Sequence, residues 1–521
     1  MMKRRRMGQS GTQRHAVLVD GCVAAILAAP CRGRPALESR ARACPRAGGG
    51  CPRHRAAIVK GTALGDATRR NAPSGTVLIV TIWIVLVLSG LALVFARSMR
   101  VAAAVSANQV ASLEAESIAA GALQFVVAKL AESAANQTTT STTSTSQTTD
   151  TYEALPVGKG YFWVLQSNLE DDRESRFGLT DESGKINLNT ASLETLQKLP
   201  GMTAELAASI IDWRDTDSDV TAGGAEDEYY LLQPTPYHCK NAPLETVSEI
   251  LLIKGASEDL LYGEDTNLNG VLDPQENDGD ESEPPDNADG KLDRGFYDYV
   301  TVYSTESNVD SEGATRINVG DSATRADLQT ALQEAFKEDR ALEILANLAT
   351  GTTYTSLIQF YYRSRMTFEE FTQIADKLTT SSETTLPGLV NVNTASKEVL
   401  MCLPGLEEKD VDALLSYRVA QSDSESLNTS AWVTEVLDQT KATGIGQYIT
   451  THSNQYSADI LAVSGNGRAY KRYKAVIDTQ GAAPRVVYWR ELAHFGWPLD
   501  PEIVATLRAG KPLTDTVLMS K

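Results

Sequence analysis

The chain has 521 residues and a net charge of −19, a length that indicates two or three compact units rather than one core. Residues 1–75 carry 15 Lys and Arg against three Asp and Glu, a net charge of +12, so the other 446 residues carry −31. Because an acidic body repels phosphate backbones, this composition argues against nonspecific nucleic-acid binding.

A basic, Arg-rich segment occupies residues 1–75 and contains four of the six cysteines. Cys239 and Cys402 remain for the rest of the chain. They either form one disulfide in an oxidising compartment or are two buried thiols, and the sequence allows both.

A long apolar segment follows at Thr76–Ala96, whose 21 residues carry no charge. A helix of this length crosses a hydrocarbon core, so we predict a membrane span rather than a buried core helix. Arg69 and Arg70 precede the span, while Arg97 and Arg100 follow it. Positive charge on both sides leaves the orientation open.

The same helix is predicted to continue into solvent. Val101–Leu130 is rich in Ala, lacks Pro and contains a single Gly, which favours a helix. A continuous stalk of this kind is typical of pilins, whose helices pack against neighbouring stalks. Gly75 and Thr76 are then the predicted leader-cleavage site, since a basic leader ends in Gly directly before the apolar helix. Most pilins carry Glu at the fifth mature position, where this chain has Val80.

Beyond a polar Ser/Thr-rich linker at Asn136–Thr149, short strands are predicted at Tyr161–Asn168 and Arg176–Thr180. A hairpin-like turn at Asp181–Gly184 is expected to lead into Lys185–Asn189. Further strands are predicted near the C-terminus, at Ser457–Val463, Tyr470–Asp478 and Arg485–Arg490. Strands at both ends with helices between them predict an α+β fold, in which a large helical insertion interrupts an antiparallel sheet.

The insertion contains an internal repeat. Lys185–Met202 reads KINLNTASLETLQKLPGM, Leu389–Leu406 reads LVNVNTASKEVLMCLPGL, and Arg316–Leu328 is a degenerate third copy without the Pro-Gly turn. Each full copy runs from an Asn-rich segment through Ser/Thr caps into a short helix and a turn. A second helix is predicted at Thr203–Arg214 and at Glu408–Arg418, which gives a helix-hairpin-helix pattern.

Helix-hairpin-helix units often bind DNA through a Gly-hydrophobic-Gly turn, whose N–H groups contact a phosphate. Here the turns are Gly201-Met202-Thr203 and Gly405-Leu406-Glu407, so both lack the second glycine and one has a carboxylate in its place. We therefore interpret the hairpins as packing units and expect no nucleic-acid partner.

The sharpest local motif is DTNLNGVLDPQE, which has the spacing of an EF-hand calcium loop with Gly270 at its sixth position. Pro274 disfavours a regular exit helix, so one flanking helix is expected. The predicted Ca²⁺ ligands are Asp265, Asn267, Asn269, the Val271 carbonyl, Asp273 and Glu276.

Two further acidic stretches are candidates for metal binding. The first directly follows the loop, and its alternative is a charged loop beside the first site; its candidate ligands are Asp278, Asp280, Asp289 and Asp293. The other is the run Asp212–Asp219 with Glu226 and Glu228. Such runs are usually solvated.

Catalytic motifs find little support. The five histidines form no H-x-x-x-H pair, and the sequence contains neither a Gly-rich phosphate loop nor G-x-S-x-G. Carboxylates gather in calcium-like loops rather than beside a base or nucleophile. We expect no enzymatic activity.

Several motifs together carry a resemblance to a known family: the Gly75/Thr76 junction, DESGKINLNTA at Asp181–Ala191, the LPGM turn, the acidic segment Asp212–Tyr230 and DGKLDRGFYDYVTVYS at Asp289–Ser304. Over about residues 75–495 the chain resembles the minor pseudopilins of type II secretion known as general secretion pathway protein K.

The resemblance implies a pilin-like helix packed on a small antiparallel sheet, with an inserted all-helical domain that binds Ca²⁺. It implies processing by prepilin peptidase and a place at the tip of a periplasmic pseudopilus. There the protein joins the I and J minor pseudopilins, contacts the major pseudopilin stalk helices, and initiates and caps assembly. The chain would cross the inner membrane lipid once, with its bulk in the periplasm. Val80 stands at the fifth mature position, where most pilins have Glu, and this difference fits a subunit at the tip of the pseudopilus.

One departure concerns the leader, which is short in this family. We expect residues 1–75 to reflect a start codon placed too early rather than an unusual extension, because they show no pattern that could pack.

Two alternative functions remain: a membrane-anchored DNA-handling protein of a competence or type IV pilus system, and an anchored calcium-dependent adhesin. The predicted domains are a leader (1–75), a span and stalk (76–135), a linker (136–151), the first part of the sheet (152–190), the helical insertion (191–450), the C-terminal strands (451–495) and a tail (496–521).

Overall fold

A computed structural model of the protein describes residues 74–137, 152–279, 281–282, 284–348, 353–421, 425–481 and 483–513. The predicted linker therefore lies outside the described residues from residue 138 onward. The chain divides into two compact units, Met1–Trp83 and Ile84–Lys521. The packing described below lies within the second unit.

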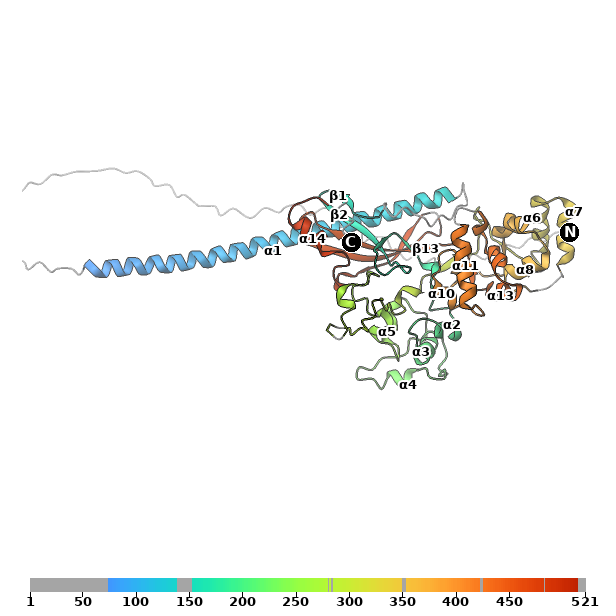
Figure 1. Ribbon diagram of the computed structural model, residues 1–521, viewed down its shortest axis with the longest axis horizontal. Helices are drawn as coiled ribbons and strands as arrows, with labels where there is room; N and C mark the ends of the chain where they lie inside the picture. Colours follow the sequence, from blue (N-terminus) through green and yellow to red (C-terminus); the bar gives the residue numbers. More distant parts are fainter. Residues whose placement is uncertain are drawn as a thin grey trace, which may run out of the picture. The chain divides into compact units, whose positions relative to one another are not determined.

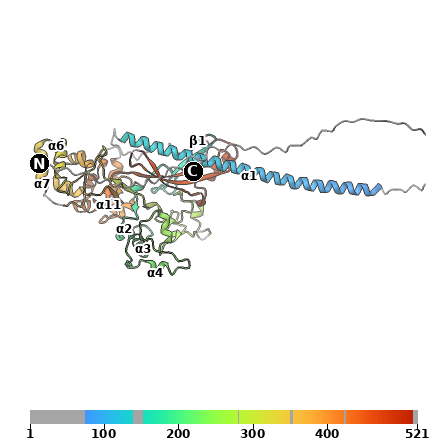
Figure 2. The ribbon, with the colours of Figure 1, turned by 180° about the vertical axis from the view of Figure 1, so that it is seen from behind.

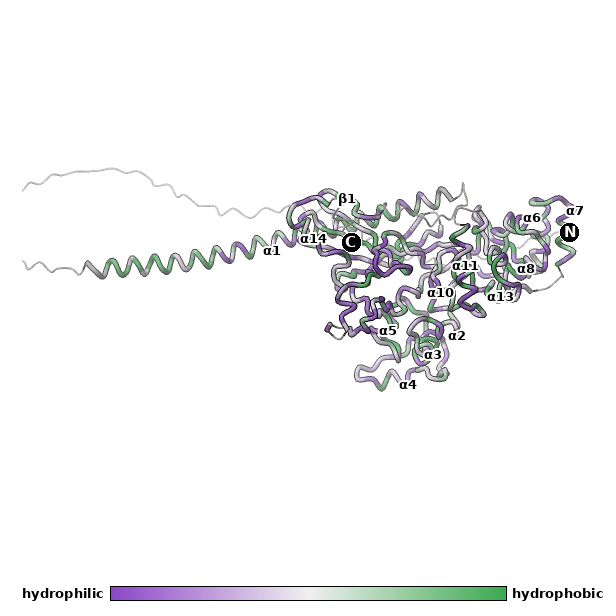
Figure 3. The backbone as a smooth tube through the Cα atoms, in the orientation of Figure 1, coloured by the Kyte–Doolittle hydropathy of each residue, from purple (hydrophilic) through white to green (hydrophobic). Residues whose placement is uncertain are grey.

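Helix α1 spans Ser74–Gln137 and agrees with the predicted continuous helix. Its first part is mostly hydrophobic in Figure 3, and its large apolar side chains are exposed. By length and composition α1 can cross a membrane once. Farther along, fully buried alanines recur every three or four residues on one face, at Ala111, Ala115, Ala119 and Ala122. Small side chains at this spacing let the helix approach its neighbour closely.

That neighbour is an antiparallel sheet with the order β1-β2-β13-β14-β15, to which β3 and β4 add short pairings with β2 and β13. One face packs on α1 through a core that includes Ala119, Phe162 and Ile460. The C-terminal half of α1 lies beside the sheet in both views (Figures 1 and 2). The strands are β1 (Leu155–Val157), β2 (Gly160–Gln166), β3 (Arg176–Phe177), β4 (Thr180–Asp181), β13 (Gln455–Val463), β14 (Tyr470–Asp478) and β15 (Arg485–Glu491).

The opposite face of the sheet carries a second apolar cluster, which includes Trp163 and Leu461. Helix α14 (Pro501–Arg508) joins it through Ile503 and Leu507. The sheet thus buries side chains on both faces, with α1 on one of them.

Between β4 and β13 the chain is mainly helical. The helices enclose two cores, a larger one that includes Trp213 and Trp432 and a smaller one that includes Phe360 and Phe371. The helices are α2 (Leu193–Gln197), α3 (Ala204–Arg214), α4 (Asp227–Tyr230), α5 (Glu258–Tyr262), α6 (Arg325–Ala335), α7 (Glu338–Asn347), α8 (Leu357–Ser364), α9 (Phe368–Ile374), α10 (Lys397–Met401), α11 (Glu408–Ala420), α12 (Val433–Val436) and α13 (Gln439–Ile445).

Three two-residue parallel strand pairs divide this helical part into modules. Each pair begins at one of the three sequence repeats and ends at a hydrophobic residue followed by Thr. They are β5 (Ile186–Asn187) with β6 (Val300–Thr301) in module 1, β8 (Ile317–Asn318) with β9 (Leu378–Thr379) in module 2, and β11 (Val390–Asn391) with β12 (Ile449–Thr450) in module 3. A further antiparallel pair joins β7 (Thr305–Ser307) to β10 (Thr385–Pro387).

The same hydrogen bond closes all three modules. The side-chain amide of each strand Asn donates to a Ser hydroxyl that follows the closing strand. The pairs are Asn187–Ser304 at 3.1 Å, Asn318–Ser382 at 2.9 Å and Asn391–Ser453 at 2.6 Å. The repeat recognised in the sequence thus extends to the end of each module.

Two expectations are settled here. The hairpin-like turn at Asp181–Gly184 is wrong, because β4 pairs with β13 whereas β5 pairs with β6 in another sheet. Residues 182–184 instead form a 3₁₀ turn, and the Asp181 side chain accepts a hydrogen bond from the Ser183 N–H at 2.8 Å. Cys239 and Cys402 are two buried free thiols. Burial raises the pKa of each thiol to about 12.

Candidate metal centre

The EF-hand-like loop lies between α5 and a 3₁₀ turn at Pro274–Glu276. The chain turns sharply here because Leu268 and Gly270 both have positive φ, +52° and +71°. Gly270 tolerates this conformation freely, whereas Leu268 does not. As predicted from Pro274, the described residues show a regular helix on the N-terminal side of the loop only.

Side-chain oxygens along the loop accept hydrogen bonds from the loop's own backbone. The carboxylate of Asp265 accepts hydrogen bonds from the Asn269 and Gly270 N–H groups, at 3.0 and 2.8 Å. Asn267 Oδ1 accepts from the Asn269 N–H at 3.0 Å, and Asn269 Oδ1 from the Val271 N–H at 2.6 Å. Asp265 and Asn267 therefore share one backbone donor, the Asn269 N–H.

The end of the motif closes on its start. Asp273 Oδ2 accepts from the amides of Asn267 and Asn269, at 2.7 and 3.1 Å. Glu276 Oε1 accepts from the Thr266 N–H at 2.9 Å, and Glu276 Oε2 from the Asp273 N–H at 3.1 Å. The five predicted side-chain ligands thus belong to one network.

Electrostatics also fit a cation at this place. Asp265 and Glu276 are only 3% and 2% exposed. Burial, together with the charges of Glu276 and Asp298, raises the pKa of Asp265 to about 7. Burial likewise raises the pKa of Glu276. Two buried carboxylates that repel each other are stabilised by a divalent cation with hard oxygen ligands such as Ca²⁺.

Within the described residues, no group of three or more His, Cys, Asp or Glu side chains converges on a single metal position. The loop contains three carboxylates among its six predicted ligands, Asp265, Asp273 and Glu276, but they do not meet at one point. Asp273 also turns its carboxylate toward the Asn267 and Asn269 amides rather than toward Asp265.

The second acidic stretch is less closely organised. Asp280 lies outside the described residues, and Asp289 and Asp293 are exposed. Asp278 accepts from the Ser282 N–H at 3.1 Å, and Asp289 from the Lys291 N–H at 2.9 Å. These carboxylates therefore order separate turns of the loop.

The third acidic run contains buried oxygens without donors. Asp212 is fully buried and accepts from the Thr221 N–H at 3.0 Å. Both Oε atoms of Glu226 and Oδ1 of Asp215 are buried and accept no N–H or O–H hydrogen bond within the part of the chain that the structure describes, and the Cys239 thiol lies beside Glu226. Burial raises the pKa of Glu226, and the charges of Asp212 and Asp215 raise it further.

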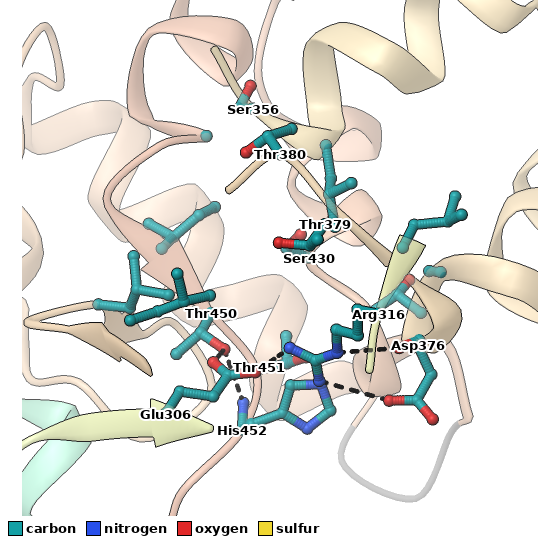
Figure 4. Close-up of a pocket in the computed structure, with 18 of the residues that line it drawn as sticks. Glu306, Arg316, Ser356, Asp376, Thr379, Thr380, Ser430, Thr450, Thr451 and His452 are labelled. Carbon is teal, nitrogen blue, oxygen red and sulfur yellow. Dashed lines mark hydrogen bonds and ion pairs between the residues drawn. The ribbon is translucent and has the colours of Figure 1, made fainter. Parts of the chain in front are cut away.

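A polar cavity of about 650 Å³ lies where modules 2 and 3 meet, and no motif in the sequence predicts it (Figure 4). Arg316 Nη1 contacts Glu306 Oε1 at 2.5 Å, and Arg316 Nε donates to the Asp376 carbonyl at 2.9 Å. Thr450 donates to Glu306 Oε2 at 2.8 Å. Burial disfavours a charge on Glu306, but His452 and Arg316 outweigh it and hold the pKa of Glu306 below its ordinary value.

Sequence reasoning missed the buried Arg472 on β14, which donates two hydrogen bonds from Nε to the carboxylate of Asp459 on β13, at 3.0 and 3.1 Å. Its only sequence signal is a charge on a strand that packs on both faces.

Gly75 and Thr76, the residues of the predicted leader-cleavage site, lie in the first turn of α1.

Comparisons with known proteins show what one part of the chain is similar to. Residues 178–262 match the family "Type II secretion system (T2SS), protein K". Type II secretion system protein K of Klebsiella pneumoniae is 38% identical over 79 residues, which are 14% of this chain and 24% of that protein. Its counterpart in Pectobacterium carotovorum subsp. carotovorum is 32% identical over 68 residues, 13% and 21% of the two chains.

The chain thus spans about a quarter of the length of the curated relatives it matches. A chain of the GspK-GspI-GspJ complex from enterotoxigenic Escherichia coli shares 14% identity, with a TM-score of 0.32 over 73% of this chain and 93% of that one. The sequence resemblance to type II secretion system protein K is confirmed for residues 178–262.

Proposed function

We propose that this chain is a minor pseudopilin at the tip of a type II secretion pseudopilus, where it initiates and caps assembly for protein export across the outer membrane. The match of residues 178–262 to type II secretion system protein K carries the proposal. In the same chain, a long apolar helix packs its second half on a small antiparallel sheet, as a pilin does.

The anchor follows from the two parts of α1. Its exposed apolar first part fits a single pass through the inner membrane lipid, and the sheet and helical modules lie in the periplasm. Prepilin peptidase cuts between Gly75 and Thr76 in this proposal. The exposed stalk then contacts the major pseudopilin helices, and the I and J minor pseudopilins complete the tip.

Helices α2–α3 and α10–α11 act as helix-hairpin-helix packing units rather than DNA-binding units. Thr203 Oγ1 accepts from the Leu206 N–H at 3.1 Å, so it occupies a donor that a phosphate would need. At the start of α11, Glu407 and Asp410 form a capping box that puts negative charge at this end. Lys198 Nζ donates to the Leu403 carbonyl at 3.2 Å and links the two units.

Calcium is part of the proposal. The loop ligands are Asp265, Asn267, Asn269, the Val271 carbonyl, Asp273 and Glu276. The buried pair Asp265 and Glu276 supports this site most strongly. The unpaired oxygens of Glu226 and Asp215 favour a second ion in the acidic run over one at the exposed Asp289 and Asp293.

The function is tested by co-expressing the full chain with I- and J-type minor pseudopilins and purifying the detergent extract by a tag on the J subunit. We expect a stable complex that contains all three chains. Recovery of the I and J subunits without this chain, at equal expression, would contradict the proposed place at the tip.

A further inference from the structure

The calcium loop is bound to the pilin-like sheet by one buried side chain. Arg472 is 0% exposed and lies on β14 opposite Leu461, on the sheet face away from α1. Its guanidinium donates to the Leu268 carbonyl at 2.6 Å and also to the Asn267 carbonyl. Both acceptors are in the loop, more than 200 residues away in sequence.

Asp459 holds this guanidinium in place. Its carboxylate accepts from Nε at 3.0 Å and from Nη2 at 2.6 Å. Burial disfavours the charge on Arg472, but Asp459 and then Asp265 outweigh it and keep the pKa of Arg472 above its ordinary value. A planar fork with five N–H donors can bind one carboxylate and two carbonyls together, which an ammonium group cannot do in this geometry.

The bonds fall where the loop backbone needs support. Leu268 has a left-handed backbone, which is strained for a residue other than glycine, and Arg472 binds its carbonyl. One further hydrogen bond and one close approach of the backbone lie at the same turn. Asn269 Nδ2 donates to the Pro498 carbonyl at 3.0 Å, and a Cβ on Gly270 would lie 3.1 Å from Ser167 Cα, just beyond β2.

We propose that Arg472, held by Asp459, is the positioning residue through which the pilin-like sheet pre-organises the calcium loop, so that Ca²⁺ binding and the order of β13–β14 are coupled. The inference rests on the proposed calcium site. It adds that Ca²⁺ acts on the sheet that packs against the stalk as well as on its own loop. Because coupling is reciprocal, a change on either side must be seen on the other.

The test uses the full chain in detergent, stripped with a chelator and titrated with CaCl₂ by calorimetry. Arg472→Lys should lower the Ca²⁺ affinity about 10- to 100-fold, the usual effect of losing a group that orients a ligand. Asp459→Asn should lower it in the same direction while keeping the guanidinium. Lys471→Met is the matched control, because Lys471 lies on the same strand but pairs with the exposed Glu491.

Hydrogen exchange gives the reciprocal readout. Ca²⁺ should slow exchange in peptides from residues 455–478 of the wild-type chain, but not of Arg472→Lys or Asp265→Asn. The coupling would be overturned if both Arg472→Lys and Asp459→Asn bound Ca²⁺ with wild-type affinity. It would also be overturned if the hydrogen-exchange rates of β13 and β14 in the wild-type chain were the same with and without Ca²⁺. A wild-type chain that binds no Ca²⁺ would instead remove the proposed site itself. If Arg472→Lys does not fold, Asp459→Asn decides the outcome.

Discussion

At the scale of single residues, buried charge distinguishes sites that look alike in sequence. The three acidic stretches have similar composition, yet among the residues that the structure describes only two of them bury carboxylates, at Asp265 and Glu276 and at Asp212 and Glu226. Exposed Asp289 and Asp293 keep their hydration and gain less from an ion.

Removing one buried carboxylate from the proposed calcium loop should weaken Ca²⁺ binding strongly. Asp265→Asn or Glu276→Gln is expected to raise the Kd at least about 100-fold, because affinity in such loops follows the number of charged ligands. Calorimetry on the full chain measures it. Asp289→Asn is the control for a lost surface charge and should leave the tighter site unchanged. An equal rise in Kd for all three variants would argue against this loop as the Ca²⁺ site.

Glu306 should control stability in acid. Its folded pKa is lowered, so its contribution is present above the unfolded value near 4.3 and is lost as pH falls through the lower folded value. Glu306→Gln should unfold about 3 kcal/mol more easily at pH 7, since Arg316 loses its buried partner. Its stability should also change less than that of the wild type between pH 5 and 3. Denaturant unfolding at each pH checks both, and parallel pH curves would contradict the assignment.

The spacing of the EF-hand-like loop could be read from the sequence, whereas its long-range partner Arg472 could not. The ligand spacing of Asp265–Glu276 is contained in twelve consecutive residues, and the structure turns these side chains into one network. Arg472 meets the loop across more than 200 residues. One strand charge cannot reveal such a partner.

At the scale of elements, periodic patterns predicted most of the sheet. Tyr470–Asp478 was located to the residue as β14, and β13 and β15 to within two residues, because alternation and turns are local signals. The Asp181–Gly184 hairpin failed because β4 and β5 are too short to specify a partner. Their pairing is decided by β13 and β6, far along the chain.

Packing of α1 on the sheet depends on its small residues. Ala119 is fully buried in this contact, so Ala119→Leu should overpack it and destabilise the fold by about 1–3 kcal/mol. Ala120, its neighbour in sequence, is exposed, and Ala120→Leu should change stability by less than about 0.5 kcal/mol. Denaturant unfolding of the full chain in detergent compares the two. Equal losses would show that the face of α1 is assigned incorrectly.

The contribution of the repeated Asn–Ser hydrogen bond to the free energy of unfolding should increase with its burial. Asn391 is fully buried and donates to Ser453 and to Asp181, so Asn391→Ala should cost about 2–3 kcal/mol. Asn318 makes the equivalent bond to Ser382 near the surface, and Asn318→Ala should cost less than about 1 kcal/mol. Thermal unfolding ranks the two variants. The reverse order would contradict the expectation that the stabilisation by this bond follows its burial.

At the scale of the whole molecule, a membrane-length helix, a small sheet and an acidic helical part occur in one chain. The sequence predicted this combination because each part has its own composition. It could not predict how the three modules close, since each closing strand is only two residues long. The pseudopilin proposal joins these parts, because one helix both anchors the chain and supports the sheet.

Leader processing tests that proposal most directly. The full chain is co-expressed with a prepilin peptidase, and the N-terminus of the membrane-extracted product is read by mass spectrometry, with Gly75→Val as the uncleavable control. The account predicts a new N-terminus at Thr76 in the wild type and none in the control. A product that stays uncut, or is cut after the apolar span, would contradict the pseudopilin assignment.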